Sequence, residues 1–383
     1  MSSLRAARKR TTVGSSPQKP PLSADEIRLR DFGAAIEAIQ RRVEGELGDK
    51  DLQYVENLRR ISRRLEISGR SLIHFSFEPL AFTTGVVALW LHKQLEVAEI
   101  GHMALHGVYE KLTSDPTLQS KTFSWKFPVD EEAWRYAHNA RHHPFTNIAG
   151  KDPDIHFGFV RLTAETPHRW IHYLQVPTVL FFTLPNFGAA INTHVTGLLD
   201  VYLGNGLDNE HDFLPDRSWK SIGAAHRKAL RKWMPYYAEN YLFYPALAGP
   251  FFWKVALGNY WAETLRDIYT GTTIFCGHVG ADVASYQPDT KSTHRGHWYA
   301  MQIEAANNFS VSRPLSILCG ALDYQIEHHL FPRLPPNRLR EISSEVRAAC
   351  DKYGVAYKTD SWPRTLKKVF AQLTKLSFPT RTT

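Results

Sequence analysis

The sequence predicts an all-α protein that is inserted in a membrane. Residues 71–91 contain one acidic residue and no Lys or Arg, and residues 171–191 contain no charged residue. Each run is close to the ~20 apolar residues that cross a bilayer as a helix. A third apolar run, residues 236–280, is long enough for two short spans despite a few charges. Aromatic side chains that suit the membrane interface flank these runs, namely Trp170, Tyr236, Trp253 and Trp261.

Polarity divides the chain into four segments. Residues 1–24 carry five basic and no acidic residues, and we expect a flexible basic tail beside anionic lipid. A transit peptide has a similar composition, but this stretch lacks a clear amphipathic repeat. Residues 25–69 have a polar, helical pattern, residues 70–345 form the expected membrane domain, and residues 346–383 form a polar C-terminal segment.

Composition excludes several classes of protein. The 383 residues carry a net charge of +8, and 43% of them are hydrophobic, which excludes a disordered chain. The three cysteines are far apart, so they predict neither a disulfide framework nor a cysteine-based metal site. The sequence has no zinc-finger spacing and no basic helix interleaved with aromatic residues, so we expect no nucleic-acid partner.

Eight of the 18 histidines fall into a pattern. One pair has the spacing HxxxH, a second group reads HNARHH, a single histidine follows at 278, and an adjacent pair follows a glutamine. Side chains at i and i+4 of a helix rise from one face, so each spaced pair could reach one metal ion. The third histidine of HNARHH would point about 100° away on an α-helix and suits a neighbouring ion. The candidate ligands are His102, His106, His138, His142, His143, His278, Gln325, His328 and His329.

This donor set predicts a pair of metal ions. A zinc peptidase would read HExxH, but position 103 is Met. A single zinc takes only three or four ligands, whereas eight imidazoles suit two ions of higher coordination. Imidazole binds Zn, Cu, Fe and Ni, and iron and copper can activate oxygen. We expect nearby carboxylates to accept hydrogen bonds from the ligand N–H groups, with Asp152, Asp154 and Glu327 as the candidates and Asp323 also close in sequence.

The ordered motifs HxxxH, HxxxHH and QxxHH resemble those of the membrane fatty acid desaturase superfamily. The stretches EIGHMALHG, HNARHHPFTNIAGKDPDI, CGHVGADV and GALDYQIEHHLFPRLPP are similar to its branch of front-end and bacterial acyl desaturases. The resemblance covers roughly residues 70–355. It implies an oxygen-dependent enzyme with two iron ions per chain, held by the residues above, that puts a double bond into a fatty acyl chain (acyl-CoA or acyl-lipid) and reduces O2 to water.

The resemblance also bears on individual positions and on the electron donor. Gln325 stands where many relatives have His, and Ile274 stands where some relatives have an Asn ligand. No HPGG haem motif occurs, so we expect electrons from a separate ferredoxin or cytochrome b5-type carrier with its reductase. Basic residues that would dock an acidic carrier, or bind anionic headgroups, are Arg227, Lys228, Arg231, Lys232, Arg333, Arg338 and Arg340.

Two other functions stay open. A lipid hydroxylase or other oxygenase of the same superfamily would share the histidine motifs and differ in its product. A non-enzymatic membrane metal-binding protein would place its histidines within the spans, whereas these motifs flank them.

All the histidine motifs must lie on one side of the membrane to share a metal pair. Arginines at 59, 60, 63, 64 and 70 favour a cytoplasmic side for the chain before the first motif. We therefore expect residues 71–101 to form a helical hairpin or a half-crossing. The resulting prediction is an integral membrane protein whose metal site lies in a cytoplasmic helical cap.

Overall fold

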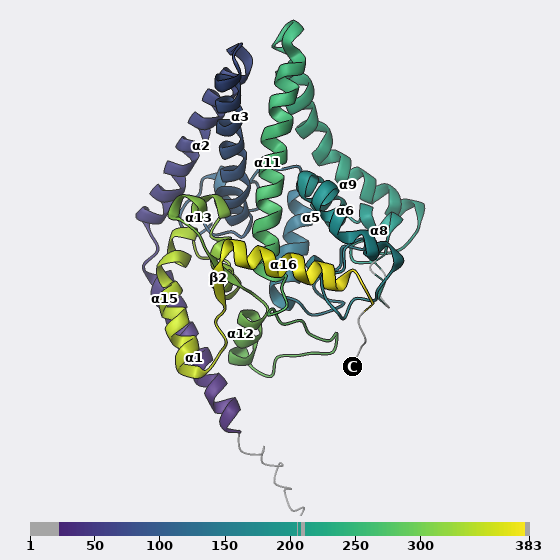
Figure 1. The fold of residues 1–383 in the computed structure, drawn as a ribbon. Coiled ribbons are helices and arrows are strands. Elements are labelled where there is room, and N and C mark those ends of the chain that lie inside the picture. Colours follow the sequence, from purple (N-terminus) through teal and green to yellow (C-terminus); the bar gives the residue numbers. More distant parts are fainter. Residues whose placement is uncertain (1–22, 205, 208–210, 380–383) are drawn as a thin grey trace, which may run out of the picture.

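The computed structural model describes residues 23–204, 206–207 and 211–379. Of the predicted basic tail, residues 1–22 lie outside this described part, and the first helix begins at Ala24. The described chain is mostly helical (Figure 1), as predicted. The longer helices are α1 (Ala24–Gly45), α2 (Asp49–Phe75), α3 (Pro79–Leu95), α9 (Trp219–Ala238), α11 (Phe252–His278), α12 (Arg295–Glu304), α15 (Pro336–Tyr353) and α16 (Trp362–Leu376).

Shorter elements complete the fold. Strands β1 (Asn308–Ser310) and β2 (Thr359–Ser361) pair in parallel, with Phe309 opposite Asp360. The short α-helices are α4 (Met103–Leu105), α5 (Glu131–Arg135), α6 (Gln175–Thr178), α7 (Phe187–Val195), α8 (Leu198–Tyr202), α10 (Tyr244–Ala246), α13 (Arg313–Cys319) and α14 (Gln325–Leu330). Four segments of the described residues are π-helical: η1 (Glu96–His102), η3 (Tyr136–His142), η7 (Val179–Thr183) and η9 (Glu239–Phe243).

Two helical hairpins project from one side of the body (Figure 1). The first consists of α2 and α3, and the second runs up through α9, η9 and α10 and returns as α11. The run 71–91 is therefore not one continuous helix. α2 ends at Phe75, and α3 begins at Pro79, where the Glu78 carboxylate accepts hydrogen bonds from the amides of Leu80 and Ala81. The chain does form a hairpin here, but its first arm is the whole of α2, so it begins at Asp49 and not within the expected range of residues 71–101.

Two glycines allow α2 and α3 to pack closely. A Cβ atom on Gly69 would lie 2.7 Å from the backbone nitrogen of Leu89, and one on Gly85 would lie 3.0 Å from the carbonyl oxygen of Gly69. Small residues let helix backbones approach in this way, above all in membranes.

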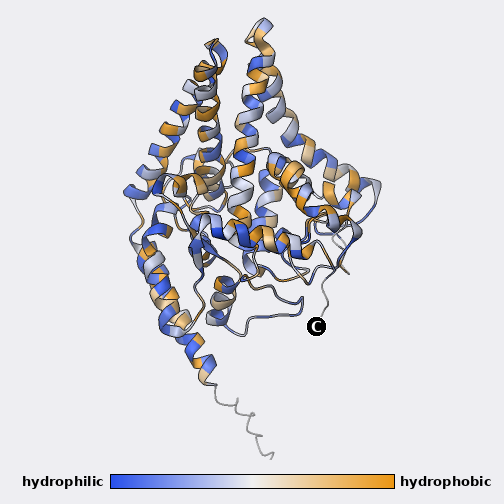
Figure 2. Ribbon diagram, in the orientation of Figure 1, coloured by the Kyte–Doolittle hydropathy of each residue, from blue (hydrophilic) through white to orange (hydrophobic). Residues whose placement is uncertain are grey.

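Hydrophobic residues recur along both hairpins, interspersed with polar ones (Figure 2), and several large apolar side chains there are exposed. Phe77 and Leu80 at the first tip are 80% and 75% exposed, and Leu242 in the second hairpin is 69% exposed. In the described part of the chain, one helical stretch, Trp170–Val195, is long and apolar enough to cross a bilayer by length and composition. It is built from several short helical pieces, and Phe181 within it is 71% exposed.

The body below the hairpins holds the main hydrophobic core. α1 packs against α12 and α15, and α16 packs against α11 and α6. The core surrounds η1, α4 and α14, which carry histidines of the first and last motifs. Two predicted segment boundaries fall inside continuous helices, since residues 69–70 lie in α2 and residues 345–346 lie in α15.

Candidate metal centre

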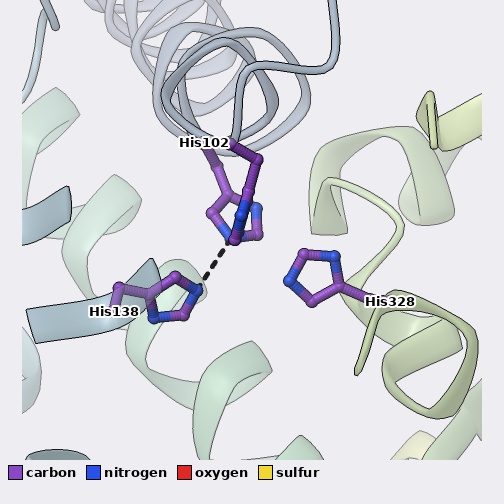
Figure 3. Close-up of side chains that lie close together, drawn as sticks. His102, His138 and His328 are labelled. Carbon is purple, nitrogen blue, oxygen red and sulfur yellow. Dashed lines mark hydrogen bonds between the residues drawn. The ribbon is translucent and has the colours of Figure 1, made fainter. Parts of the chain in front are cut away.

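The eight predicted histidines converge at the base of the two hairpins, although they come from four separate parts of the chain. Ligand atoms of one group lie within 4.8 Å of one another, and Figure 3 shows three of its side chains pointing to a common centre. This first group is His102, His106, His138 and His328. A second group, with the same spacing, is His142, His278 and His329.

His143 lies between the two groups. Its Nε2 is 3.1 Å from Nε2 of His138, and its ring stacks on that of His329 with centroids 4.5 Å apart. The neighbours His142 and His143 thus face different parts of the site.

Local helix geometry explains this arrangement. His102 ends the π-helix η1, and both His138 and His142 lie in the π-helix η3. A π-helix bonds residue i to residue i+5 and recurs at functional sites. The wider turn brings His143, five residues after His138, back over the same face, which an α-helical period does not do.

The contacts between the rings fit a shared cation. Nε2 atoms face each other at 3.1 Å between His102 and His106 and at 3.0 Å between His278 and His329. Within the described part of the chain, both ring nitrogens of His328 and Nε2 of His142 are buried without a hydrogen-bond partner. Buried polar atoms are rarely left unpaired, and a shared metal ion would satisfy this set of nitrogens. The residues therefore fit a metal centre with imidazole ligands.

Burial keeps most of these imidazoles in the neutral form that binds metal. It lowers the pKa well below 6.5 for six of them, namely His102, His106, His143, His278, His328 and His329. Burial also opposes a charge on His142, but the carboxylates of Asp152 and Asp154 outweigh it and raise the pKa of His142 to about 9. These two carboxylates would stabilise the positive charge of a metal ion in the same way.

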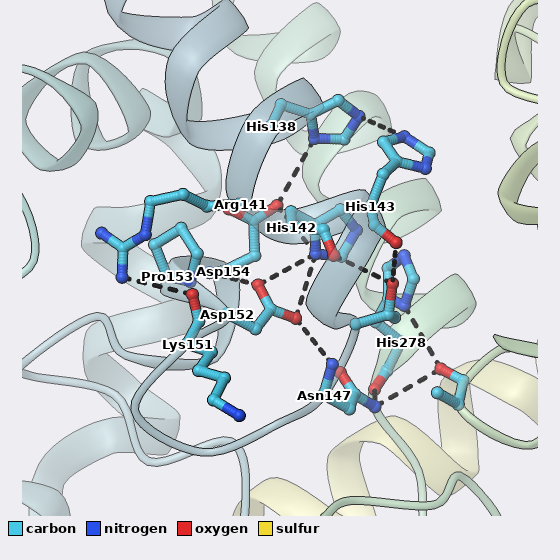
Figure 4. A network of polar contacts seen from close by, with 12 residues as sticks. His138, Arg141, His142, His143, Asn147, Lys151, Asp152, Pro153, Asp154 and His278 are labelled. Carbon is cyan, nitrogen blue, oxygen red and sulfur yellow. Dashed lines mark hydrogen bonds and ion pairs between the residues drawn. The ribbon is translucent and has the colours of Figure 1, made fainter. Parts of the chain in front are cut away.

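Asp152 and Asp154 lie directly behind the ligands (Figure 4). His142 donates from Nδ1 to Asp152, whose two carboxylate oxygens are each 3.0 Å away. Asp152 is held in turn by the amides of Asn147 and Asp154, at 2.7 and 2.9 Å. The Asp154 carboxylate lies 3.6 Å from Nδ1 of both His138 and His142. Asp152 thus accepts a hydrogen bond from a candidate ligand, whereas Asp154 lies close enough to His138 and His142 to form a third possible ligand group with them.

Glu327 has another role. Its carboxylate accepts hydrogen bonds from Asn308 and Tyr357, each at 2.8 Å. Its described contacts include no candidate ligand, so it anchors α14 to β1 instead of supporting an imidazole. The physical reason is the helix itself: His328 and His329 both face the metal site, and Glu327 lies about 200° around the helix from His329.

Gln325 lies at the second group. Its Nε2 is 2.6 Å from Nε2 of His278, and its Oε1 is buried without a hydrogen-bond partner among the described residues. Ile274, at the position of an Asn in some relatives, lines the cavity beside the site.

Four residues support the site and were not predicted. His329 donates from Nδ1 towards Gln302 Oε1 at 3.0 Å, and Thr146 Oγ1 is 3.1 Å from the same nitrogen. The indole of Trp134 stacks on His138 with centroids 4.4 Å apart. Asn147 adopts a positive φ of 55° and bonds the carbonyl oxygen of Ala284. Thr146 and Trp134 are four residues from histidines of the second motif, and this helical spacing could have predicted their contacts with the site. Gln302 has no such relation in sequence to any of the motifs.

An apolar cavity adjoins the histidines. Its wall includes imidazoles of both groups, so an apolar molecule inside it would lie beside any bound metal. The remaining wall is mostly apolar, which excludes water. Its lining includes His102, His138, His142, His278, Val97, Trp125, Phe127, Ile155, Phe157, Leu162 and Phe187.

Comparison with known proteins agrees with this geometry. The protein-family model described as fatty acid desaturase matches residues 77–361. The chain is 32% identical over 360 residues to an NADPH-dependent stearoyl-CoA 9-desaturase of Mycobacterium tuberculosis, covering 92% of this chain and 80% of that protein. It is 27% identical to an sn-1 linoleoyl-lipid 6-desaturase of Synechocystis, covering 68% and 70% of the two chains. It is 25% identical to an acyl-lipid (8-3)-desaturase of Mortierella alpina, covering 83% and 72%.

The family match covers most of the chain. The structure independently places histidine clusters beside an apolar cavity. The chain belongs to the fatty acid desaturase family, and it is an oxidoreductase that desaturates fatty acyl chains.

Proposed function

We propose that the chain binds two iron ions through its eight clustered histidines and introduces a double bond into a fatty acyl chain that lies in the apolar cavity. The observation that carries this proposal is the convergence of unpartnered imidazole nitrogens on the wall of that cavity. An unactivated methylene has no acidic proton, so the iron pair would supply the oxygen-dependent oxidation, with O2 reduced to water.

The side chains of the protein would hold and orient these reactants. The first group would hold one ion, the second group would hold the other with Gln325 beside it, and His143 would lie between them. Asp152 would keep Nδ1 of His142 protonated, so that Nε2 is presented to the metal. Apolar residues of the wall would position the acyl chain and keep water out.

Metal and product analysis of the purified protein tests the proposal. We expect two iron ions per chain and an acyl product that has lost two hydrogens. One zinc and no iron would contradict the di-iron assignment. A product that has gained one oxygen atom would identify the hydroxylase alternative.

We further propose that the tips of both hairpins and the stretch Trp170–Val195 are embedded in the membrane, with the histidines on the cytoplasmic side. Exposed apolar side chains on these elements support this arrangement, since soluble proteins seldom expose so large an apolar surface. The paired hairpins return the chain to one side, as a shared metal site requires. Release of the protein by carbonate without detergent would contradict integral insertion.

The acyl donor and the electron carrier belong to this proposal as well. Relatives are named for stearoyl-CoA and for acyl-lipid substrates, so we propose an acyl-CoA or acyl-lipid substrate. Electrons would come from a ferredoxin or cytochrome b5-type carrier with its reductase.

Several basic residues expected to dock this carrier are engaged elsewhere. Arg340 is buried against Glu99 at 2.7 Å, and Arg338 pairs with Asp51 at 2.7 Å. Arg231 and Lys232 likewise form ion pairs, with Asp130 and Glu131. These ion pairs offset the four charges, so Arg227, Lys228 and Arg333, which are exposed, would be the members of the expected set that contact the carrier.

A further inference from the structure

The C-terminal helix α16 lies across α11 at the foot of the second hairpin (Figure 1). Its first residue, Trp362, contacts the Tyr269 ring of α11, with centroids 5.2 Å apart. Tyr269 directly follows Ile268, which is 37% exposed and is the last large apolar side chain exposed on α11. α16 therefore begins at the depth at which the apolar surface of the hairpin ends.

The other end of α16 reaches the start of the apolar stretch Trp170–Val195. Phe378, two residues after the helix, is 55% exposed, and its ring lies 5.9 Å from that of Tyr173, which is 52% exposed. Side chains of residues 161–175 also donate to the last carbonyl oxygens, namely Gln175 to Leu373, His168 to Ser377 and Arg161 to Phe378. Exposed aromatic rings favour the membrane interface, so this end of α16 lies at the same level as the first.

The two flanks of α16 differ in polarity. Successive residues point about 100° apart, and Val369 points into the core. On one flank Lys368 pairs with Asp282 at 2.8 Å, in the loop beyond the histidine end of α11. The opposite flank carries Leu366 and Phe370, which are half-buried. α16 thus turns a polar flank towards the histidines and an apolar flank towards the hairpins.

The basic residues of α16 outnumber the carboxylates that contact it. The helix has no acidic residue and four basic ones, namely Arg364, Lys367, Lys368 and Lys375. Two carboxylates pair with it: Asp282 and Asp360 both contact Lys368, and Asp360 also lies 3.6 Å from Arg364. These contacts offset two of the four positive charges.

The other two charges are on the outward face. Lys367 and Lys375 are exposed, and neither forms an ion pair with a described residue. They point about 80° apart, with the exposed Ala371 between them along the helix. Residues 161–175, which hold the end of α16, contain one acid, Glu165, and this carboxylate accepts a hydrogen bond from Ser285 at 2.8 Å. The outward face therefore presents two lysines without a local counter-charge.

We propose that α16 lies in the plane of the membrane surface, where Lys367 and Lys375 bind anionic head groups of the surrounding bilayer. This proposal rests on the proposed membrane insertion. A helix with an apolar edge and a basic polar face is typical of helices that lie in the interface. Both ends of α16 are fixed at the depth of the interface, so the partner of its outward face is the lipid surface and not an acidic protein.

The test measures which lipid lies next to α16 in the full-length protein. Ala371→Cys carries a thiol-reactive fluorophore in vesicles of phosphatidylcholine and phosphatidylglycerol, and the native cysteines are buried. Quenching is measured with each lipid in turn carrying a nitroxide on the acyl chain next to its head. The ratio of the two lipid association constants gives the preference for the anionic lipid.

Two double variants of the labelled protein complete the comparison. Lys367→Gln with Lys375→Gln removes the two charges that lack a counter-charge. Arg347→Gln with Lys352→Gln removes two exposed charges from α15 in the body, so it is the matched control with the same net charge.

We expect phosphatidylglycerol to be preferred by about 5-fold or more, because each lysine close to an anionic surface contributes about that factor. The preference should disappear in the variant of α16 and persist in the control. A ratio near one in the wild type, or an unchanged ratio in the variant of α16, would overturn the proposal. Quenching by aqueous iodide and by neither lipid would place the outward face in water and would also overturn it.

A second label separates this proposal from the insertion on which it rests. Phe77→Cys places the same fluorophore at the tip of the first hairpin, where the side chain is 80% exposed. If neither lipid quenches this position, membrane insertion itself fails. If the lipids quench the tip and not position 371, insertion stands and the proposal for α16 fails.

Discussion

The histidines of the two groups are oriented by different means. In the second group, hydrogen bonds from Nδ1 orient each ring: His142 bonds Asp152, His278 bonds the carbonyl oxygen of Ala305, and His329 bonds Gln302. In the first group, Nδ1 of His102 and of His328 is buried without such a partner in the described part of the chain. Packing against neighbouring rings, such as Trp134 on His102 at 5.6 Å, orients these side chains instead.

This difference predicts how substitutions affect the metal. His328→Ala removes a ligand and should abolish both metal retention at the first group and desaturation. Asp152→Asn keeps the ligands but removes the carboxylate behind His142, and should lower metal affinity or activity by roughly 10–100-fold. Iron content and turnover measured on the same preparations check both results. Full activity of His328→Ala would contradict the ligand assignment.

The buried side chain of His156 predicts that the free energy of unfolding falls at acidic pH. This side chain is 2% exposed, and its Nε2 accepts a hydrogen bond from the amide of Gly150 at 3.3 Å. Burial, with smaller contributions from His194 and Arg141, lowers its pKa to about 3. Below pH 6.5 the unfolded chain gains a proton that the folded chain does not, so the free energy of unfolding falls by ~1.4 kcal/mol per pH unit from this residue.

The melting temperature in detergent at pH 7 and pH 5 measures this effect. Other buried histidines contribute to the same trend, so the comparison is made with His156→Gln, in which the amide side chain can still accept the hydrogen bond. The variant should lose less stability between the two pH values than the wild type does. Equal losses in both proteins would contradict the assigned role.

At the scale of elements, helix type and helix contact decide the site. The π-helices η1 and η3 present the first two motifs, and α14 presents the third from the opposite side. The buried ion pair between Arg340 of α15 and Glu99 of η1 fastens one π-helix to the body, with Nη1 and Nη2 of Arg340 at 2.7 and 2.8 Å from the carboxylate.

The first hairpin depends on its glycines. A side chain at position 85 would meet the backbone of α2, since a Cβ atom there lies 3.0 Å from the backbone nitrogen of Ile73. Gly85→Leu should therefore separate α2 from α3 and cost at least about 1–3 kcal/mol. Gly45→Leu is the matched control, because a Cβ atom at that position meets nothing within 4 Å.

Thermal melting and size-exclusion profiles in detergent report the result. We expect a lower melting temperature and aggregation for Gly85→Leu and a wild-type profile for Gly45→Leu. A wild-type melting temperature for Gly85→Leu would show that the helices do not pack as closely as described.

At the scale of the whole molecule, the hairpins and the body offer different environments to a probe. The three native cysteines are buried, so a thiol-reactive fluorophore would label an introduced cysteine selectively. Phe77→Cys and Leu247→Cys place the probe at exposed apolar positions at the ends of the two hairpins, whereas Arg347→Cys places it on α15 in the body.

In vesicles that contain lipids with a quencher on the acyl chain, we expect strong quenching at both hairpin positions and little on α15. This result follows because apolar side chains at the tips would contact lipid tails. Equal quenching at all three positions would contradict insertion by the hairpins.

The sequence by itself determined the helical class, the family and the candidate ligands. These features are local, because spacing within a motif is set by the chain, and motif order is read directly. For the same reason Asp152 and Asp154, which follow the second motif by only a few residues, could be named as neighbours of the candidate ligands.

Only the tertiary structure decided how the candidates are combined. The division of histidines into two groups, the support of His329 by Gln302 and the anchoring of α14 by Glu327 all depend on contacts between segments far apart in sequence. The same holds for Arg340, which looked like a surface cation and is neutralised by Glu99. The sequence gives the charge and size of each side chain directly. The partner of that side chain depends on how distant helices pack, and this packing brings the histidines together at one site.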